Sequence, residues 1–228
     1  MLILEIGLNS YVNMLKINSI LIVLVLSSCS TISSNNIAPG YGQAYEEIKN
    51  FLFGYESNLD LNYIEAIPYA SMIVKIGNGP SGLMILESKV NDKYTWVSAD
   101  GVYLVIQKGR IIQSQGLSND LDEVVNSFKG WEGKFKNKQL ISYFSFDEPL
   151  LSNLKILSIF NTIGMEDVEL QMQSLNLKLV VERISAPIVG WERVNKYWID
   201  ENNFVWKSNQ NISPRLPNIS YEVTKKPL

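Results

Sequence analysis

From Tyr69 onward, short apolar segments alternate with turn signals, and this pattern limits the fold more than any other feature of the sequence. The alternation of apolar runs with residues that favour turns is typical of antiparallel strands joined by tight connections. The sequence therefore predicts an antiparallel meander. The turn signals are Gly77-Asn78-Gly79-Pro80, Asn91-Asp92, Ala99-Asp100-Gly101 and Lys108-Gly109.

The second half of the chain continues the strand pattern. Leu175, Leu177, Leu179 and Val181 alternate with polar or smaller neighbours, as expected of a strand with one buried face. So many strands without intervening βαβ units favour a mainly β fold, either a large antiparallel β-barrel or a barrel-like sandwich. Further strands are expected at 139–147, 153–161, 166–173, 175–185, 189–199, 203–209 and 219–224.

Two helices are expected beside the strands. Tyr45, Ile48 and Leu52 recur at helical spacing before Gly54, which predicts an N-terminal amphipathic helix over residues 42–53. A short internal helix is expected over 117–128. There Leu121, Val124, Val125 and Phe128 share a helical face, and Ser118 or Asn119 is available as a cap.

An unbroken apolar run from Ile20 to Leu26 is followed by two small serines and Cys29. This order is typical of a signal peptide, predicted here over residues 1–28. The run is far shorter than the roughly 20 residues needed to span a bilayer. Translation is expected to start at Met14, since Lys16 follows it while Glu5 lies in the segment before it.

Leu26-Ser27-Ser28-Cys29 is similar to the lipobox of bacterial lipoproteins. The similarity implies that Cys29 is acylated and becomes the first mature residue, and two or three acyl chains hold a protein stably on a membrane. Residues 29–42 are then a lipidated flexible tether, and 43–228 a single mainly β periplasmic domain. Ser30 stands where an aspartate would favour the inner membrane, so lipid anchoring at the periplasmic face of the outer membrane is expected.

Several functions are excluded by composition. The chain has no histidine, a single cysteine and a formal net charge of −3. It therefore lacks imidazole or thiolate metal sites, nucleophilic pairs that use histidine, and the basic surface of a nucleic-acid binder. We expect no cofactor, no bound metal and no nucleic-acid partner.

The mature chain resembles the YjbF/GfcB family of periplasmic lipoproteins, which is associated with group 4 capsule and exopolysaccharide loci. The resemblance implies a YmcC-like barrel and a role in polysaccharide secretion or assembly beside an outer-membrane polysaccharide-export barrel protein. It implies no catalytic residue. Asn203 stands where the family often has glycine, and asparagine tolerates the same left-handed backbone. The matching segments are Ile67-Pro68-Tyr69-Ala70-Ser71, Trp96, Gly109-Arg110-Ile111-Ile112, Gly116-Leu117, Gly190-Trp191, Tyr197-Trp198-Ile199-Asp200, Ser208 and Gln210.

Aromatic side chains are the candidate glycan contacts, because flat rings suit the apolar faces of sugars. The predicted contact residues are Trp96, Trp191, Trp198 and Tyr197. The competing interpretation, favoured by the frequency of these residues in strands, is that the rings fill the core. Tyr197 and Trp198 are adjacent, so they face opposite sides of a strand.

Two alternatives to a non-catalytic accessory role remain at this point. A glycosidase needs a pair of carboxyl groups, for which Asp100, Asp147, Glu192 and Asp200 are formally available, although turn chemistry explains Asp100 and Asp200. A lipid- or glycan-binding carrier needs a hollow barrel, and strand alternation does not distinguish a hollow interior from a filled one.

Overall fold

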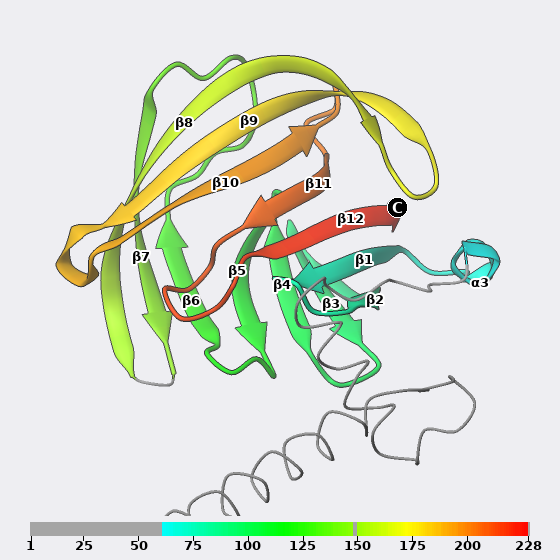
Figure 1. Ribbon diagram of the computed structural model, residues 1–228, viewed down its shortest axis with the longest axis horizontal. Helices are drawn as coiled ribbons and strands as arrows, with labels where there is room; N and C mark the ends of the chain where they lie inside the picture. Colours follow the sequence, from blue (N-terminus) through cyan, green and yellow to red (C-terminus); the bar gives the residue numbers. More distant parts are fainter. Residues whose placement is uncertain (1–60, 148–149, 228) are drawn as a thin grey trace, which may run out of the picture. The chain divides into compact units, whose positions relative to one another are not determined.

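The computed structural model describes residues 61–147 and 150–227, and most of this part of the chain is β-structure (Figure 1). A short helix precedes the strands, and a single 3-10 turn interrupts them. The elements are α3 (Leu61–Ala66), β1 (Ser71–Ile76), β2 (Ser81–Val90), β3 (Lys93–Ser98), β4 (Tyr103–Gln107), β5 (Arg110–Gln115), β6 (Leu121–Asn126), β7 (Lys138–Phe146), β8 (Leu151–Glu169), β9 (Ser174–Ala186), η2 (Pro187–Val189), β10 (Trp191–Ile199), β11 (Val205–Gln210) and β12 (Ile219–Lys225).

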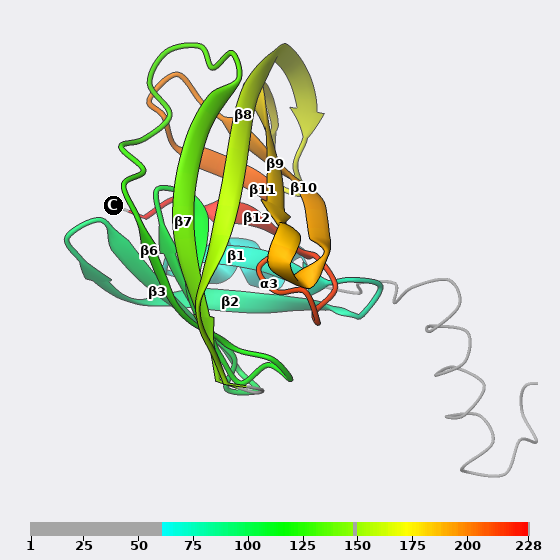
Figure 2. The same ribbon diagram turned by 90° about the vertical axis from the view of Figure 1, so that its left-hand side faces the viewer.

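The strands form one 12-stranded antiparallel sheet in the order β5-β4-β3-β2-β1-β12-β11-β10-β9-β8-β7-β6. Strands that follow one another in sequence are paired, except for β5 and β6, and the first strand β1 pairs with the last strand β12. The sheet curls into a nearly closed barrel, which Figure 2 shows from its side. The predicted mainly β antiparallel barrel is confirmed.

The barrel has a seam between β5 and β6, the two ends of the sheet. Side chains bridge this seam in place of a backbone ladder. Ser114 Oγ donates to Asp120 Oδ1 at 2.8 Å and accepts from the backbone N–H of Leu121 at 2.9 Å. The other carboxylate oxygen of Asp120 accepts from the backbone N–H of Gly116 at 2.8 Å. Asp120 thus fixes the connection that joins the two edges.

The internal helix expected over 117–128 is wrong, because Leu121–Asn126 forms the edge strand β6. It pairs with β7, with Val124 opposite Phe144, and a register shift lies between Leu121 and Glu123. That irregularity places apolar residues at spacings that imitate a helical face. Pairing with the long strand β7 overrides the local pattern.

The segment expected to hold two strands, 153–161 and 166–173, is a single long strand. β8 runs from Leu151 to Glu169 and pairs with β9 along most of its length. A register shift between Thr162 and Gly164 bends it where a break was expected. In Figure 1, β8 and β9 arch together, and the tip of their hairpin approaches β12.

The predicted turns are present and use left-handed backbone where the sequence supplies suitable residues. Asn91 has φ 57° and Gly109 has φ 76° in two of the tight connections. Asn203 has φ 63°, so asparagine does occupy the left-handed position at which the family often has glycine.

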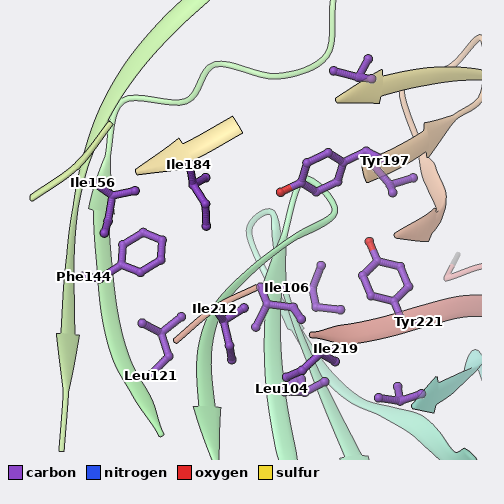
Figure 3. Packing of buried hydrophobic residues seen from close by; sticks show 14 of the residues in the cluster. Leu104, Ile106, Leu121, Phe144, Ile156, Ile184, Tyr197, Ile212, Ile219 and Tyr221 are labelled. Atoms are coloured by element: carbon purple, nitrogen blue, oxygen red, sulfur yellow. The ribbon is translucent and has the colours of Figure 1, made fainter. Parts of the chain in front are cut away.

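Side chains from opposite walls fill the barrel interior. Figure 3 shows Phe144 and Ile156 from one wall converging with Ile219 and Tyr221 from β12. All four belong to one buried apolar cluster. The interior of the described barrel is therefore filled with side chains. Strand alternation in the sequence could not distinguish a filled interior from a hollow one.

Two connections contribute to this filling. The segment between β6 and β7 brings Trp131 and Phe135 into the core cluster. The indole N–H of Trp131 donates to the backbone carbonyl of Lys108 at 2.6 Å. The connection between β11 and β12 buries Ile212 in the same cluster.

The predictions for the signal peptide (residues 1–28), the tether (29–42) and the amphipathic helix (42–53) lie outside the described residues. They stay predictions, as does the domain boundary at residue 43. Within the described part of the chain, no helix is both long and apolar enough to cross a bilayer.

Candidate functional site

Three of the four predicted glycan-contact residues lie in the barrel core. Trp96 on β3 and Trp191 on β10 are 3% and 4% exposed, and Tyr197 on β10 is fully buried. All three belong to the main apolar cluster. As the barrel stands, they present no ring face to a sugar. Trp198, the neighbour of Tyr197, points to the opposite side of β10 and is partly exposed.

Glu182 is the centre of a polar network inside the barrel. It lies on β9 between the inward-facing Val180 and Ile184, and it is fully buried. Its Oε1 accepts from Arg110 Nη2 at 2.7 Å. Its Oε2 accepts from the hydroxyl of Tyr197 at 2.7 Å and from Asn195 Nδ2 at 3.1 Å. Two strands, β5 and β10, thus place three donors around one carboxylate on β9.

Aromatic rings surround the guanidinium of Arg110. Its central carbon lies 5.1 Å from the ring centroid of Phe128 and 5.6 Å from that of Phe160. Burial lowers the pKa of Arg110, but the adjacent Glu182 carboxylate more than offsets this and leaves the pKa raised. Burial also raises the pKa of Tyr197 well above its usual value, and the charge of Glu182 adds to the effect. Arg110 therefore stays charged and Tyr197 stays a hydrogen-bond donor.

A second set of buried hydrogen bonds ties the β4–β5 turn to β11 and β12. The Gln210 side chain accepts from the backbone N–H of Ile111 at 3.0 Å and donates to the Gly109 carbonyl at 2.9 Å. The Tyr221 hydroxyl donates to the same carbonyl at 2.8 Å. At Gly109 a Cβ would lie 2.2 Å from Cγ2 of Val205, so the close approach requires glycine.

Several of the family-like segments therefore meet in space. Gly109, Arg110, Tyr197, Ser208 and Gln210 come from separate parts of the sequence and share this interior network. Glu182 is enclosed by the barrel and hydrogen-bonded to these donors, so the network holds β5, β9 and β10 together. Glu182 was not foreseen, because the predicted alternation of Leu175, Leu177, Leu179 and Val181 puts residue 182 on the polar face of the strand. In the structure Val180, Glu182 and Ile184 point inward instead.

A partly exposed aromatic cluster lies on the other face of β10 and β11. It consists of Trp198, Phe204 and Trp206, which we call the tryptophan surface. The rings of Phe204 and Trp206 are 5.2 Å apart and meet edge to face. Phe204 and Trp206 were not among the predicted contacts, and their spacing of two residues near a turn was the available signal.

Charged groups flank the tryptophan surface. Lys226 Nζ lies 4.4 Å from the ring centroid of Phe204 and 3.4 Å from Asp200 Oδ2. The same carboxylate oxygen accepts from Trp206 Nε1 at 3.0 Å. Lys207 Nζ lies 6.0 Å from the ring centroid of Trp198. Rings with cations and a carboxylate beside them provide both stacking faces and hydrogen-bonding groups.

The β8–β9 hairpin covers part of this surface. Val168, Leu170 and Leu177 form a small buried cluster against which Trp198 and Trp206 pack. The indole N–H of Trp198 donates to Glu166 on β8. The hairpin therefore leaves the tryptophans partly rather than fully exposed.

The four carboxylates considered for a glycosidase lie in different parts of the barrel. Asp100 is in the β3–β4 turn, Asp147 follows β7, and Glu192 is on β10. Asp200 caps the β10–β11 turn, where its Oδ1 accepts from the backbone N–H of Phe204 at 2.8 Å. Among residues 61–147 and 150–227, no group of three acidic or sulfur side chains is arranged to hold a metal ion.

Comparison with known proteins places these features in a family. The family model described as "Group 4 capsule polysaccharide lipoprotein gfcB, YjbF" matches residues 45–223. The lipoprotein YjbF of Escherichia coli K12 is 24% identical over 199 residues, which cover 84% of this chain and 88% of YjbF. The lipoprotein GfcB of the same organism is 23% identical over 147 residues, covering 60% of this chain and 66% of GfcB.

A solved structure shares the fold. The crystal structure of the hypothetical lipoprotein YmcC from Escherichia coli K12 superposes with a TM-score of 0.65 and 20% identity, covering 80% of this chain and 96% of YmcC. The barrel architecture is therefore common to both proteins. With its family match extending over most of the sequence, the chain belongs to the YjbF family of group 4 capsule polysaccharide lipoproteins.

Proposed function

We propose that this protein is a periplasmic lipoprotein that assists capsule or exopolysaccharide secretion or assembly at the outer membrane. The observation that carries the proposal is the family match over residues 45–223, whose description names a group 4 capsule polysaccharide lipoprotein. The enclosed Arg110–Glu182 network supports a structural rather than a catalytic use of the buried charges. The role is therefore one of contact with a partner or with polymer.

The membrane attachment in this proposal is through acylated Cys29, and the primary partner is an outer-membrane polysaccharide-export barrel. Two or three acyl chains give an attachment that survives membrane isolation. Affinity purification of the lipidated protein from its native envelope, followed by mass spectrometry, tests the partner. Recovery of such a barrel supports the proposal, and a protein that purifies alone or with inner-membrane proteins contradicts it.

Direct contact with polymer is assigned to the tryptophan surface. Trp198 is the member of the predicted contact set whose ring reaches the outside, and Phe204 and Trp206 extend it. Lys207 and Lys226 lie beside the rings, paired with Glu222 and Asp200, and these groups supply hydrogen-bonding partners for sugar hydroxyls. The alternative of a carrier with a hollow barrel gains no support from the packed interior.

Titration of the full-length lipidated protein in detergent with purified cognate polymer tests this contact. Removing one stacking ring with Trp206→Ala should weaken binding roughly three- to tenfold, since an aromatic contact contributes about 0.5–1.5 kcal/mol. Tyr143→Ala, which removes a ring that is 41% exposed on β7, is the matched control. Equal loss in both variants, or none in either, contradicts the assignment.

A further inference from the structure

An apolar groove follows the β1–β2 hairpin. It has a volume of about 970 Å³ and is bounded by α3 and the segment after it, by both strands of the hairpin, and by the β3–β4 turn. Figure 1 shows α3 beside the start of β1. The volume is at the upper end of the roughly 300–1,000 Å³ typical of small-molecule sites. Apolar lining residues include Ile67, Val74, Leu83, Ile85, Val97 and Val102.

The groove has the length of an acyl chain. Its lining extends from Tyr69, just before β1, to Ile76 at the end of β1. A six-residue strand spans about 20 Å at roughly 3.3 Å per residue. An acyl chain spans half of a hydrocarbon core that is about 30 Å thick. The groove is therefore long enough to hold one extended chain.

The polar groups of the lining indicate the head group. Asp100 is the single charged residue among the lining residues, and it accepts a hydrogen bond from Ser98 in the same turn. At the opposite end of the groove, beside α3, Tyr63 and Tyr69 are 63% and 61% exposed, so their rings are accessible there. Amphipathic tyrosines suit a boundary between apolar and aqueous surroundings. A carboxylate without a neighbouring cation in the lining favours an ammonium group over a purely anionic one.

We infer that this groove binds one acyl chain of a membrane phospholipid whose head group carries an ammonium. The lining offers too few polar groups for a sugar, whose hydroxyls need hydrogen-bonding partners. The source of the lipid is the bilayer at which the proposed anchor at Cys29 holds the protein, so this step rests on the proposed lipid attachment. This inference goes beyond the proposed accessory function and does not depend on polymer binding.

Photo-cross-linking tests the inference. The full-length lipidated protein is placed in vesicles of phosphatidylethanolamine and phosphatidylcholine that contain a phospholipid with a diazirine near the end of one acyl chain. After illumination and digestion, labelled peptides are identified by mass spectrometry. Label concentrated in residues 63–102 is the expected result. Label spread evenly over the barrel overturns the inference. Label absent from these residues also overturns it, and this is the result expected if protein rather than lipid occupies the groove.

Gly82 provides a variant that fills the groove. It belongs to the lining, its φ is not in the left-handed region, and a Cβ built there meets no atom within 4 Å. Gly82→Leu should reduce groove labelling about tenfold, the effect of excluding roughly two methylenes. Gly164→Leu on β8 is the matched control, because a Cβ there also meets nothing within 4 Å and Gly164 does not line the groove. Equal labelling in the two variants overturns the inference.

Two further variants cover folding and head-group choice. If Gly82→Leu does not fold, Ile85→Asn tests the same groove at a side chain that is already 36% exposed. It should also reduce groove labelling. In separate vesicles that present the photoactive phospholipid with either a phosphatidylethanolamine or a phosphatidylglycerol head group, the unaltered protein should label more strongly with the former. Asp100→Asn should abolish this preference while leaving acyl-chain labelling in place. An unchanged preference overturns the head-group assignment.

Discussion

Replacing Glu182 with leucine removes the acceptor on which three buried donors converge. The substitution leaves the Arg110 guanidinium, 6% exposed, without its carboxylate partner, and it removes the acceptor of Tyr197 and Asn195. Breaking a buried ion pair from one side costs about 3–5 kcal/mol. We expect Glu182→Leu to lower the free energy of unfolding by about that amount. This loss is large beside the roughly 0.05–0.15 kcal/mol per residue that keeps a domain folded.

The double variant Arg110→Met/Glu182→Leu removes both charges, so it distinguishes the cost of an unpaired buried charge from the cost of altered side-chain packing. Methionine can pack against the rings of Phe128 and Phe160 that now contact the guanidinium. The double variant should therefore lose less stability than the two single variants summed, with a coupling of about 1–3 kcal/mol. The exposed Glu192 on β10 supplies the control, since Glu192→Leu should change stability by no more than about 0.5 kcal/mol.

Urea unfolding of the full-length chain, followed by tryptophan fluorescence, measures these differences. Urea is uncharged, so it does not screen the ion pair as guanidinium would. Trp131 lies 4.6 Å from the Tyr197 ring and reports on this region. A loss below about 1 kcal/mol for Glu182→Leu, or strict additivity in the double variant, would refute the view that Glu182 compensates a buried charge.

Three other predictions follow from local features. Gly109→Ala places a Cβ 2.2 Å from a side-chain carbon of β11 at φ +76°, so it should lower the free energy of unfolding by at least about 2 kcal/mol in urea titration. The control is Gly101→Ala, at φ +84° in open space, which should cost only about 1 kcal/mol. Burial raises the pKa of Tyr197 and Tyr221, so above pH 10 these hydroxyls lose their protons in the unfolded state while they keep them in the folded state. The two groups should therefore not affect stability well below pH 10. Above it, the free energy of unfolding should fall by up to about 1.4 kcal/mol per pH unit for each tyrosine. The double variant Tyr197→Phe/Tyr221→Phe should show a shallower fall in the free energy of unfolding above pH 10. The same slope in the variant and the unaltered protein would contradict this. Cys29→Ala should leave the protein unprocessed and absent from membranes, as judged by fractionation and palmitate labelling; continued lipidation would disprove the anchor.

The turn residues made the meander predictable from sequence. Asn91, Gly109 and Asn203 occupy left-handed backbone at connections between strands, and only glycine or a short amide adopts it readily. Local chemistry therefore determines where strands end. It does not determine which strands pair, and the helix expected over 117–128 is wrong because the partner strand β7 decides the conformation of that segment.

The candidate site was predictable only in part, because a residue type does not reveal which face of a strand it occupies. Tyr197 and Trp198 had to face opposite sides, but only the structure shows that Trp198 is the outward one. Trp96 and Trp191 resemble Trp198 in sequence and yet are buried. The groove was not foreseen, since its walls combine α3 with two hairpins and no single segment carries its pattern.

The pairing of the first strand with the last sets the order in which the barrel can be completed. Ile76 lies opposite Ile219 and Val74 opposite Tyr221, contacts between residues far apart in the sequence. Such non-local pairing slows folding, because a long loop must close before the contact stabilises anything. A chain that emerges from a membrane N-terminus first exposes the open edge of β1 until β12 arrives. Biogenesis of this protein therefore includes an interval in which an unpaired strand edge needs protection from other chains.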